Sequence, residues 1–182
     1  MKLLLHTCCA PCTSALIRSS VFSREESRPV FFWYNPNIHP YTEYRSRRDS
    51  LAAFARDLGL ELLMEDEYGL REFIQALYSK EGPRGNRCHF CYRLRLEATA
   101  REAAGKGYQA FSTSLLCSPF QNHDLIRQIG EECAREYKLG FFYRDFRPWF
   151  NEGKKMAREK GSYMQKYCGC IFSEEERYSQ LI

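Results

Sequence analysis

Short apolar runs alternate with longer amphipathic stretches along the whole chain, and this alternation limits the folds open to it. Runs such as "KLLLH" and "PVFFWYN" lack the regular polar positions of a half-exposed strand, as is typical of strands buried on both faces. Strands are expected at 2–6, 29–35, 60–66, 108–114 and 140–146, and helices at 13–22, 41–58, 69–80, 88–107, 122–137 and over most of the last 35 residues. Five strands separated by helices predict an α/β fold with helices on both faces of a mostly parallel sheet.

The 182 residues are enough for one domain with a substantial core, and no linker, repeat or low-complexity segment divides them. We therefore expect a single domain over residues 1–182. No apolar run approaches the roughly 20 residues of a membrane span, and "LLL" is shorter than the apolar part of a signal peptide. These features predict a cytoplasmic protein with no membrane partner, in a compartment that disfavours structural disulfides.

Polar and sulfur-containing segments follow four of the expected strands. "HTCCAPCT" follows the first strand, "NPNIHP" the second, "SLLCSPFQN" the fourth and "RDFRP" the fifth. Ligands of parallel sheets bind beyond the carboxyl ends of the strands, which lie at one edge of the sheet. The sequence therefore predicts the functional site at this edge.

Seven of the nine cysteines fall into three tight groups, which are Cys8, Cys9 and Cys12, then Cys88 and Cys91, then Cys168 and Cys170. Cys133 is expected to be a small buried helix residue. Cys117 lies in an edge loop without a near partner in the sequence. Dense cysteine groups in a reducing compartment indicate a zinc site, a redox dithiol or an iron–sulfur cluster. Seven grouped thiols exceed what one zinc ion needs, which favours an iron–sulfur cluster with redox thiols and leaves zinc as the alternative.

The Cys168-Gly169-Cys170 segment has two interpretations. A disulfide between cysteines one residue apart closes a small strained ring, and strain raises the reduction potential, which suits electron transfer. Alternatively, both thiolates bind metal. The net charge of +4 also has two interpretations. Lys and Arg are concentrated at 43–50, 91–101 and 151–167, and these segments are either solvated helix faces or binding surfaces for a polyanion such as nucleic acid.

Six segments together resemble the cobalamin-independent epoxyqueuosine reductases, the QueH family, nearly from end to end. They are "LLLHTCCAPCT", "FFWYNPNIHPYTEYRSR", "EGPRGNRCHFCYRLRLEATA", "FSTSLLCSPFQNHDLI", "FFYRDFR" and "SYMQKYCGCIFS". The doubled Cys8-Cys9 with Cys12, the RCxxC followed by RLRLE, and the terminal YCGCxFS make a highly specific combination. The resemblance implies a Rossmann-like, HUP-type domain and the last step of queuosine biosynthesis, an oxidoreductase reaction. In that step epoxyqueuosine is reduced to queuosine at the wobble position of tRNAs with GUN anticodons, with an electron donor and without cobalamin or ATP.

The resemblance also implies cofactors. It places a 4Fe–4S cluster on Cys8, Cys9, Cys88 and Cys91 and a redox-active pair at Cys168 and Cys170. A mononuclear iron beside the cluster is a further expectation. Its candidate ligands are Cys12, a thiolate of the CGC segment and the carboxylate of Asp145, which is also a candidate catalytic residue.

The chain departs from the family pattern at two places. "EGPRGNRC" carries a proline and an inserted stretch before Cys88, and "PWFNEGKK" replaces the usual sequence after "DFR". The fold is similar to that of tRNA-modifying ATP pyrophosphatases, but "HTCCAPCTS" stands where their SGGxDS phosphate loop would be. This absence weighs against a tRNA thiolation enzyme, the main rival among enzymes. A zinc-stabilised RNA-binding module without chemistry is the rival from another class.

Other polar residues near the same edge are candidates for substrate binding. Tyr34, Asn35, Asn37 and His39 are placed to bind the modified base or its diol, or else form an Asx-type turn. Arg147 is expected as a phosphate contact, and His6 as a buried hydrogen-bonding residue. Arg93 faces either the cluster or tRNA, or is an exposed helix residue. "RSRR" and the basic segment 151–167 are expected to contact the tRNA backbone, so binding should weaken with salt.

Overall fold

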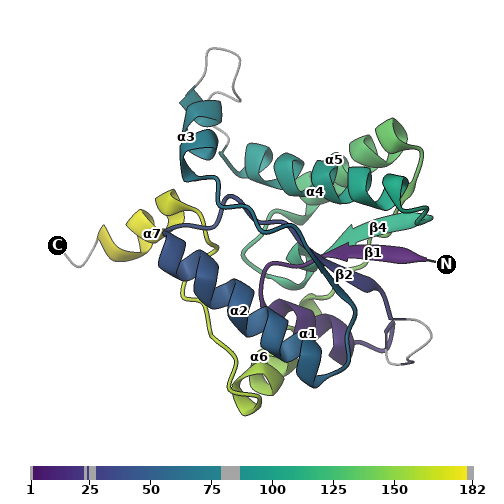
Figure 1. Ribbon diagram of the computed structural model, residues 1–182, viewed down its shortest axis with the longest axis horizontal. Helices are drawn as coiled ribbons and strands as arrows, with labels where there is room; N and C mark the ends of the chain where they lie inside the picture. Colours follow the sequence, from purple (N-terminus) through teal and green to yellow (C-terminus); the bar gives the residue numbers. More distant parts are fainter. Residues whose placement is uncertain (1, 23, 25–27, 79–86, 180–182) are drawn as a thin grey trace.

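The computed structural model describes residues 2–22, 24, 28–78 and 87–179, and its centre is a five-stranded parallel sheet (Figure 1). The strand order is β3 (Leu62–Met64), β2 (Val30–Trp33), β1 (Leu3–His6), β4 (Ala110–Thr113) and β5 (Gly140–Phe141). The central strand β1 pairs in parallel with β2 and β4, with Leu5 opposite Phe31 and Ser112. The expected α/β architecture is confirmed.

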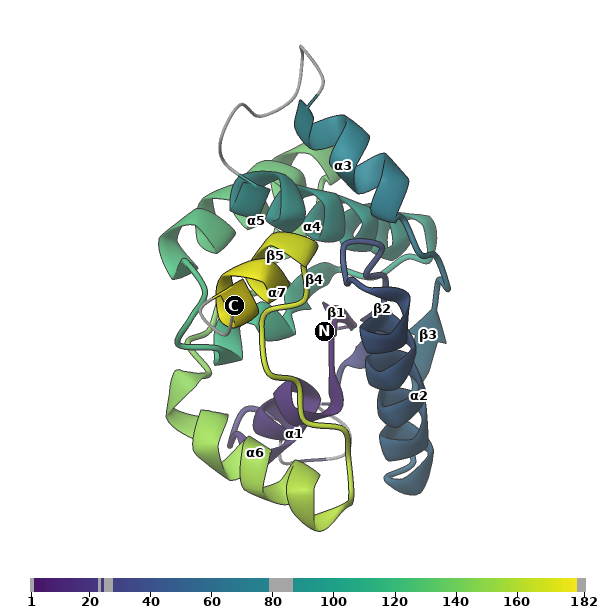
Figure 2. The same ribbon diagram turned by 90° about the vertical axis from the view of Figure 1, so that its left-hand side faces the viewer.

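Helices cover both faces of the sheet, as Figures 1 and 2 show. One face carries α4 (Arg87–Gly105) and α5 (His123–Tyr137), and the other carries α1 (Ala10–Arg18), α2 (Tyr41–Asp57) and α6 (Phe150–Glu159). Two short helices, α3 (Leu70–Tyr78) and α7 (Ile171–Tyr178), lie beyond the carboxyl ends of the strands. Two 3₁₀ turns, η2 (Ser114–Cys117) and η3 (Arg147–Trp149), complete the described elements. None of the described helices is long and apolar enough to cross a membrane.

The core fills the space between the sheet and these helices. Leu4 and Leu5 of β1 are fully buried, as are Trp33 of β2 and Phe111 of β4. Helices α1 and α6 approach each other closely at Gly153, where an added Cβ would lie only 2.5 Å from the backbone nitrogen of Ala15. This contact fixes the position of α6, and therefore of the segment that follows it, against α1.

Three of the differences from the predicted boundaries have a clear structural cause. Helix α1 begins at Ala10 rather than at 13, because Cys9 caps it and Pro11 suits the first turn. Strand β5 ends at Phe141, since the chain then turns to bury Phe146, whose amide donates to the Leu116 carbonyl. The last break between helices spans 160–170 rather than "YCGC" alone. The expected loop "KEGPRGNR" lies outside the described residues apart from Arg87.

Candidate functional site

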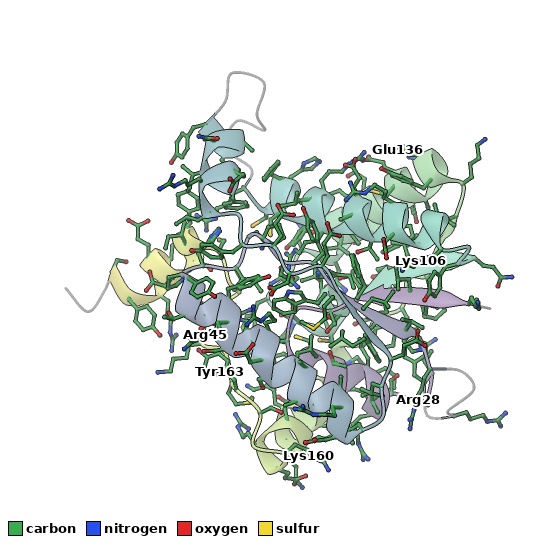
Figure 3. All side chains as sticks on the ribbon, in the orientation of Figure 1. Arg28, Arg45, Lys106, Glu136, Lys160 and Tyr163 are labelled. Carbon is green, nitrogen blue, oxygen red and sulfur yellow. The ribbon has the colours of Figure 1, made fainter. Side chains whose placement is uncertain are left out.

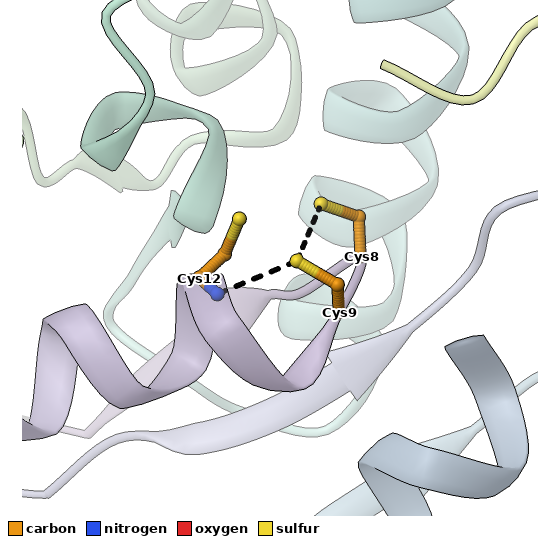
Figure 4. A group of neighbouring side chains, drawn as sticks. All are labelled: Cys8, Cys9 and Cys12. Atoms are coloured by element: carbon orange, nitrogen blue, oxygen red, sulfur yellow. Dashed lines mark hydrogen bonds between the residues drawn. The ribbon is translucent and has the colours of Figure 1, made fainter. Parts of the chain in front are cut away.

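The cysteine group at the end of β1 forms a compact cluster of thiols. The Sγ atoms of Cys8, Cys9 and Cys12 all lie within 4.8 Å of one another, and all three side chains are buried (Figure 4). The Cys9 sulfur accepts a hydrogen bond of 3.3 Å from the backbone nitrogen of Cys12, which is the N-cap contact of α1. The strand-to-helix turn therefore sets the geometry of the cluster. It is the one group of its kind among the residues that the structure describes.

The three thiols differ in their ease of ionisation. Hydrogen bonds from Cys12 and Cys9 lower the pKa of Cys8 well below its usual value. Burial raises the pKa of Cys9, and a hydrogen bond with Cys117 raises that of Cys12. Without a bound cation, the cluster therefore favours a thiolate at Cys8 and thiols at Cys9 and Cys12. Because metals bind thiolates, occupation of the cluster would release protons.

The second cysteine group is linked to the first through Arg95, a buried residue of α4. Arg95 donates through Nη2 to the Cys91 sulfur at 2.9 Å and through Nε to the Cys91 carbonyl at 3.2 Å. Asn37 donates to the same sulfur at 3.1 Å. Burial raises the pKa of Cys91 to about 11, whereas the positive charge of Arg95 acts to lower it. Arg95 also acts to lower the pKa of Cys8 and of Cys168, so its positive charge favours a thiolate in each of the three cysteine groups.

The third group lies on an extended segment, residues 160–170, which we call the strap. The strap runs from α6 to α7 (Figure 2). It is held by buried Arg47 of α2, which donates to the carbonyl oxygens of Tyr167 at 2.9 Å and Cys168 at 3.1 Å. Glu43 in turn pairs with Arg47 at 2.6 Å and accepts a hydrogen bond from the Tyr163 hydroxyl. Tyr163 lies beside α2 in Figure 3.

Gly169 allows the turn between the two strap cysteines. Its φ of +128° belongs to a region that favours glycine, and its carbonyl accepts a hydrogen bond of 2.7 Å from the His39 amide. In this turn Cys168 is exposed and Cys170 is buried. A hydrogen bond with Cys170 lowers the pKa of Cys168 to about 5, while the same contact raises the pKa of Cys170. The pair therefore favours a thiolate beside a thiol at neutral pH.

A cavity of about 390 Å³ opens onto the thiols. The cysteines Cys8, Cys12 and Cys168 line it, together with the strap residue Gln165. Gln165 donates through Nε2 to the Cys9 sulfur at 2.9 Å, and its buried Oε1 has no hydrogen-bond partner. The remaining lining residues are Pro11, Arg47, Leu115, Ser118, Phe120, Gln121, Phe150, Lys154, Met164, Lys166, Tyr167 and Arg177.

The donor set fits a metal centre held by sulfur. The Sγ atoms of Cys8, Cys9 and Cys12 lie within 4.8 Å of one another in a buried site, and the positive charge of Arg95 acts to lower the pKa of both Cys8 and Cys91. Thiolates are the ligands of zinc and of iron–sulfur clusters. Cys88 lies one turn before Cys91 on α4 and is exposed, so the structure does not bring it into the cluster of three.

The residues expected to bind substrate lie mostly inside the fold. Tyr34, Asn35, Asn37 and His39 are all buried, and none of them lines the cavity. Asn35 accepts a hydrogen bond of 3.1 Å from His6 Nε2 through Oδ1 and donates through Nδ2 to the Thr7 carbonyl at 2.9 Å, so it braces the loop that carries the cysteines. His6 is fully buried and hydrogen-bonded, as expected.

Two other expected site residues pair with each other at the surface. Arg147 donates to the Asp145 carboxylate through Nε and Nη2, the latter at 2.7 Å, and this pair lowers the pKa of Asp145 to about 2. Neither residue lines the cavity, and Asp145 does not join Cys12. Arg93 is half-buried and pairs with Glu97 and Glu136, away from the thiols.

Several functional residues escape sequence reasoning. Arg95, Arg47 and Gln165 contact the thiols or the strap from distant parts of the chain. Arg47 belongs to "RSRR", the segment expected to contact the tRNA backbone; for Arg47 this expectation is wrong, because its side chain is buried and pairs with Glu43. Cys117 has no partner in the sequence but is buried beside Cys12, with which it shares a hydrogen bond. The position of Cys117 after β4 in the sequence indicates that it lies near Cys12, because β4 ends at the same edge of the sheet as β1. Cys133 is buried in α5, as expected.

A pH prediction follows from His39. Burial lowers its pKa to about 4, since Nε2 contacts only the Pro36 carbonyl and Nδ1 has no partner. An unfolded histidine titrates near pH 6.5, so between about 4 and 6.5 the unfolded chain binds the extra proton. We therefore expect the free energy of unfolding to decrease as the pH is lowered through this window, by at most about 1.4 kcal/mol per pH unit from this residue. Denaturant unfolding of the wild type and of His39→Phe between pH 4.5 and 7.5 measures the difference. Equal pH slopes for the two proteins would contradict the prediction.

Comparison with known proteins gives consistent matches along the chain. A family model described as Epoxyqueuosine reductase QueH matches residues 3–176. A protein of Dehalococcoides mccartyi is 37% identical over 180 residues, which cover 98% of this chain and 96% of the relative. One of Thermotoga maritima is 37% identical, covering 96% of this chain and 91% of the relative, and one of Haemophilus influenzae is 33% identical, covering 94% and 71%. All three relatives are named Epoxyqueuosine reductase QueH.

Proposed function

Because the chain belongs to the epoxyqueuosine reductase QueH family, a family of oxidoreductases, we propose that it reduces epoxyqueuosine to queuosine at the wobble position of tRNA. The observation that carries this proposal is a cavity of about 390 Å³ lined by cysteines of two groups, Cys8 and Cys12 of the buried thiol cluster and Cys168 of the strap. Pockets of roughly 300–1,000 Å³ hold small molecules, so a single modified nucleoside is a suitable occupant. Cationic lining residues such as Lys154 and Lys166 suit an RNA substrate.

We assign a 4Fe–4S cluster to Cys8, Cys9, Cys88 and Cys91, with Cys12 as a candidate ligand of a further iron. The burial of Cys8, Cys9, Cys12 and Cys91 supports thiolate ligation in a dry site, and Asn37, Arg95 and Gln165 supply hydrogen bonds to the sulfur atoms. A bound cluster supplies the site with a one-electron redox centre. Hydrogen bonds to sulfur raise the potential of such a centre, so these three side chains would tune it.

Removal of the epoxide oxygen as water consumes two electrons and two protons. The Cys168 thiolate and the Cys170 thiol together hold two electrons and one proton, which they release when they form a disulfide. The second proton comes from solvent. Cys168 lines the cavity and Cys170 is buried in the same turn, which supports a role for the pair as the electron relay. An external electron donor then restores the dithiol.

Anaerobic purification followed by metal analysis and an activity assay tests the proposal. We expect about four irons and four sulfides per chain, broad absorbance near 400 nm, and conversion of epoxyqueuosine in tRNA with a strong chemical reductant. About one additional iron would support the mononuclear site. Zinc without sulfide, together with no turnover, would instead support an RNA-binding module and overturn the proposal.

A further inference from the structure

The side chain of Phe120 is the most exposed large hydrophobic group in the described part of the chain. Its exposed fraction is 82%, yet it also lines the cavity that opens onto the thiols. An isolated exposed apolar residue needs no explanation, but one at the rim of a candidate active site is placed to meet the substrate. The surroundings of Phe120 therefore decide what it can bind.

The loop that presents Phe120 is firmly held. The Phe120 amide donates to the Ser118 hydroxyl at 3.3 Å, and the Asn122 side chain caps α5 by accepting from the Leu125 amide at 3.0 Å. Tyr92 of α4 donates to the Gln121 side chain at 2.7 Å and accepts from the Asn122 amide at 3.2 Å. The ring is therefore displayed to solvent by an ordered loop, at little entropic cost for binding.

A second aromatic ring and a cation complete the rim. Phe150, at the start of α6, meets Phe120 edge to face, with ring centroids 6.1 Å apart and an interplanar angle of 78°. Lys154, one helical turn later, places Nζ 5.2 Å from the centroid of the Phe150 ring. The two rings lie nearly perpendicular, and the exposed fraction of 82% leaves most of the Phe120 ring available for stacking.

The charge of the rim is uniformly positive. Lys154, Lys166 and Arg177 line the cavity, whereas no acidic residue does so among the described lining residues. None of these three cations forms an ion pair with a carboxylate in the described part of the chain. In contrast, Arg48, Arg93 and Arg127 elsewhere on the surface are all neutralised by partners. Unpaired cations beside an exposed aromatic ring favour an anionic, aromatic ligand.

We propose that Phe120 stacks on a nucleobase next to the wobble nucleotide, while Lys154, Lys166 and Arg177 contact the phosphates on either side. This inference rests on the proposed function, because it assumes that the wobble nucleoside enters the cavity. Single-stranded RNA is recognised by aromatic rings on which unstacked bases rest and by a positive path for the backbone. The rim carries both elements within one ordered surface.

Binding of an RNA anticodon stem-loop tests the stacking site without any turnover. Two RNAs are used, each with an unmodified guanine at the wobble position. One carries the fluorescent base 2-aminopurine on the 5′ side of this guanine, and the other carries it on the 3′ side. We expect the wild type to change the fluorescence of one of the two probes. Phe120→Ala should weaken binding by about 5- to 100-fold, since loss of one stacked base has effects of this size. Phe120→Trp should bind within about threefold of the wild type, and Phe120→Leu, which keeps apolar area without a ring, should resemble Phe120→Ala.

Two controls separate stacking from general effects. Tyr78→Ala removes another exposed aromatic residue, 74% exposed and absent from the cavity lining, and should leave RNA affinity unchanged. Lys154→Gln should make the dependence of log Kd on log salt shallower by about 0.7, as expected for one lost phosphate contact to a single strand. Thermal melting of each variant establishes that the fold is intact.

Two results would overturn the stacking site. One is RNA affinity of Phe120→Ala within twofold of the wild type. The other is a Phe120→Ala protein that binds RNA normally and turns over more slowly only when a protein electron donor replaces the chemical reductant. That result would assign Phe120 to the binding of a protein partner. If the wild type binds the RNA through Phe120 but leaves epoxyqueuosine intact in the metal-loaded state, the proposed reaction fails and the stacking site stands.

Discussion

Replacing both Cys168 and Cys170 with serine is expected to lower epoxyqueuosine turnover by about a thousandfold or more, while the iron and sulfide content stays unchanged. Serine cannot store electrons as a disulfide does, so the relay is lost. The exposed position of Cys168 and its pKa of about 5 make its thiolate available at neutral pH, and buried Cys170 lies behind it in the Gly169 turn. Turnover with a chemical reductant and metal analysis on the same preparation measure the two effects.

Cys133→Ala provides the matched control for this double variant. Cys133 is a buried cysteine of α5 and belongs to none of the three groups, so turnover should remain near the wild-type value. Unchanged turnover of the Cys168→Ser, Cys170→Ser protein would eliminate the relay. Loss of iron or sulfide along with turnover would indicate that the strap cysteines bind metal instead.

Arg47→Met is expected to destabilise the protein by about 3–5 kcal/mol, because it leaves Glu43 buried without its counter-ion. The exposed fractions of the Arg47 and Glu43 side chains are only 1% and 7%. The substitution also removes the donors to the Tyr167 and Cys168 carbonyl oxygens, so the strap should loosen over the cavity. Denaturant unfolding measures the stability, and the rate at which iodoacetamide alkylates Cys170 in the folded, metal-free protein should rise.

The neighbouring residue Arg48 supplies the control. Arg48 pairs with Asp49 and Asp66, whose side chains are 57% and 52% exposed, so Arg48→Met should cost less than about 1 kcal/mol. Combining Arg47→Met with Glu43→Gln should recover part of the loss, because the unpaired charge is then removed. If Arg47→Met unfolds at the same denaturant concentration as Arg48→Met, the buried pair does not hold the strap.

Features that depend on neighbouring residues in the sequence are predicted well. The apolar runs locate all five strands. The three central strands are buried on both faces and need a continuous apolar segment, whereas the edge strands β3 and β5 are only partly buried. Cys8, Cys9 and Cys12 meet because they share one strand-to-helix turn. Cys117 follows a strand, so the prediction of a site at the carboxyl ends of the strands also applies to it. Its partner Cys12 is far away in the sequence and is seen only in the structure.

Features that depend on contacts between distant segments are not predicted. Arg95 and Arg93 lie on the same helix two residues apart, and only the packing of α4 decides that Arg95 faces the thiols and Arg93 the surface. Asn35 and Asn37 have the residue type of ligand-binding side chains, but the approach of β1 and α4 turns them into internal braces. Burial of polar groups of this kind depends on tertiary partners that no local pattern encodes.

The size of the cavity restricts the shape of nucleic acid that reaches the thiols. About 390 Å³ admits one nucleoside, and its walls are built from ordered elements, namely the start of α1, the Phe120 loop, α6 and the anchored strap. A base that stays stacked between its neighbours cannot enter, because the stack as a whole is larger than the cavity. If the chain carries out the proposed reaction, the wobble nucleoside has to swing out of the anticodon loop before reduction, at a cost of a few kcal/mol that is least for an unpaired base. Guanine analogues inside a double helix would consequently be excluded by shape, whatever their chemistry.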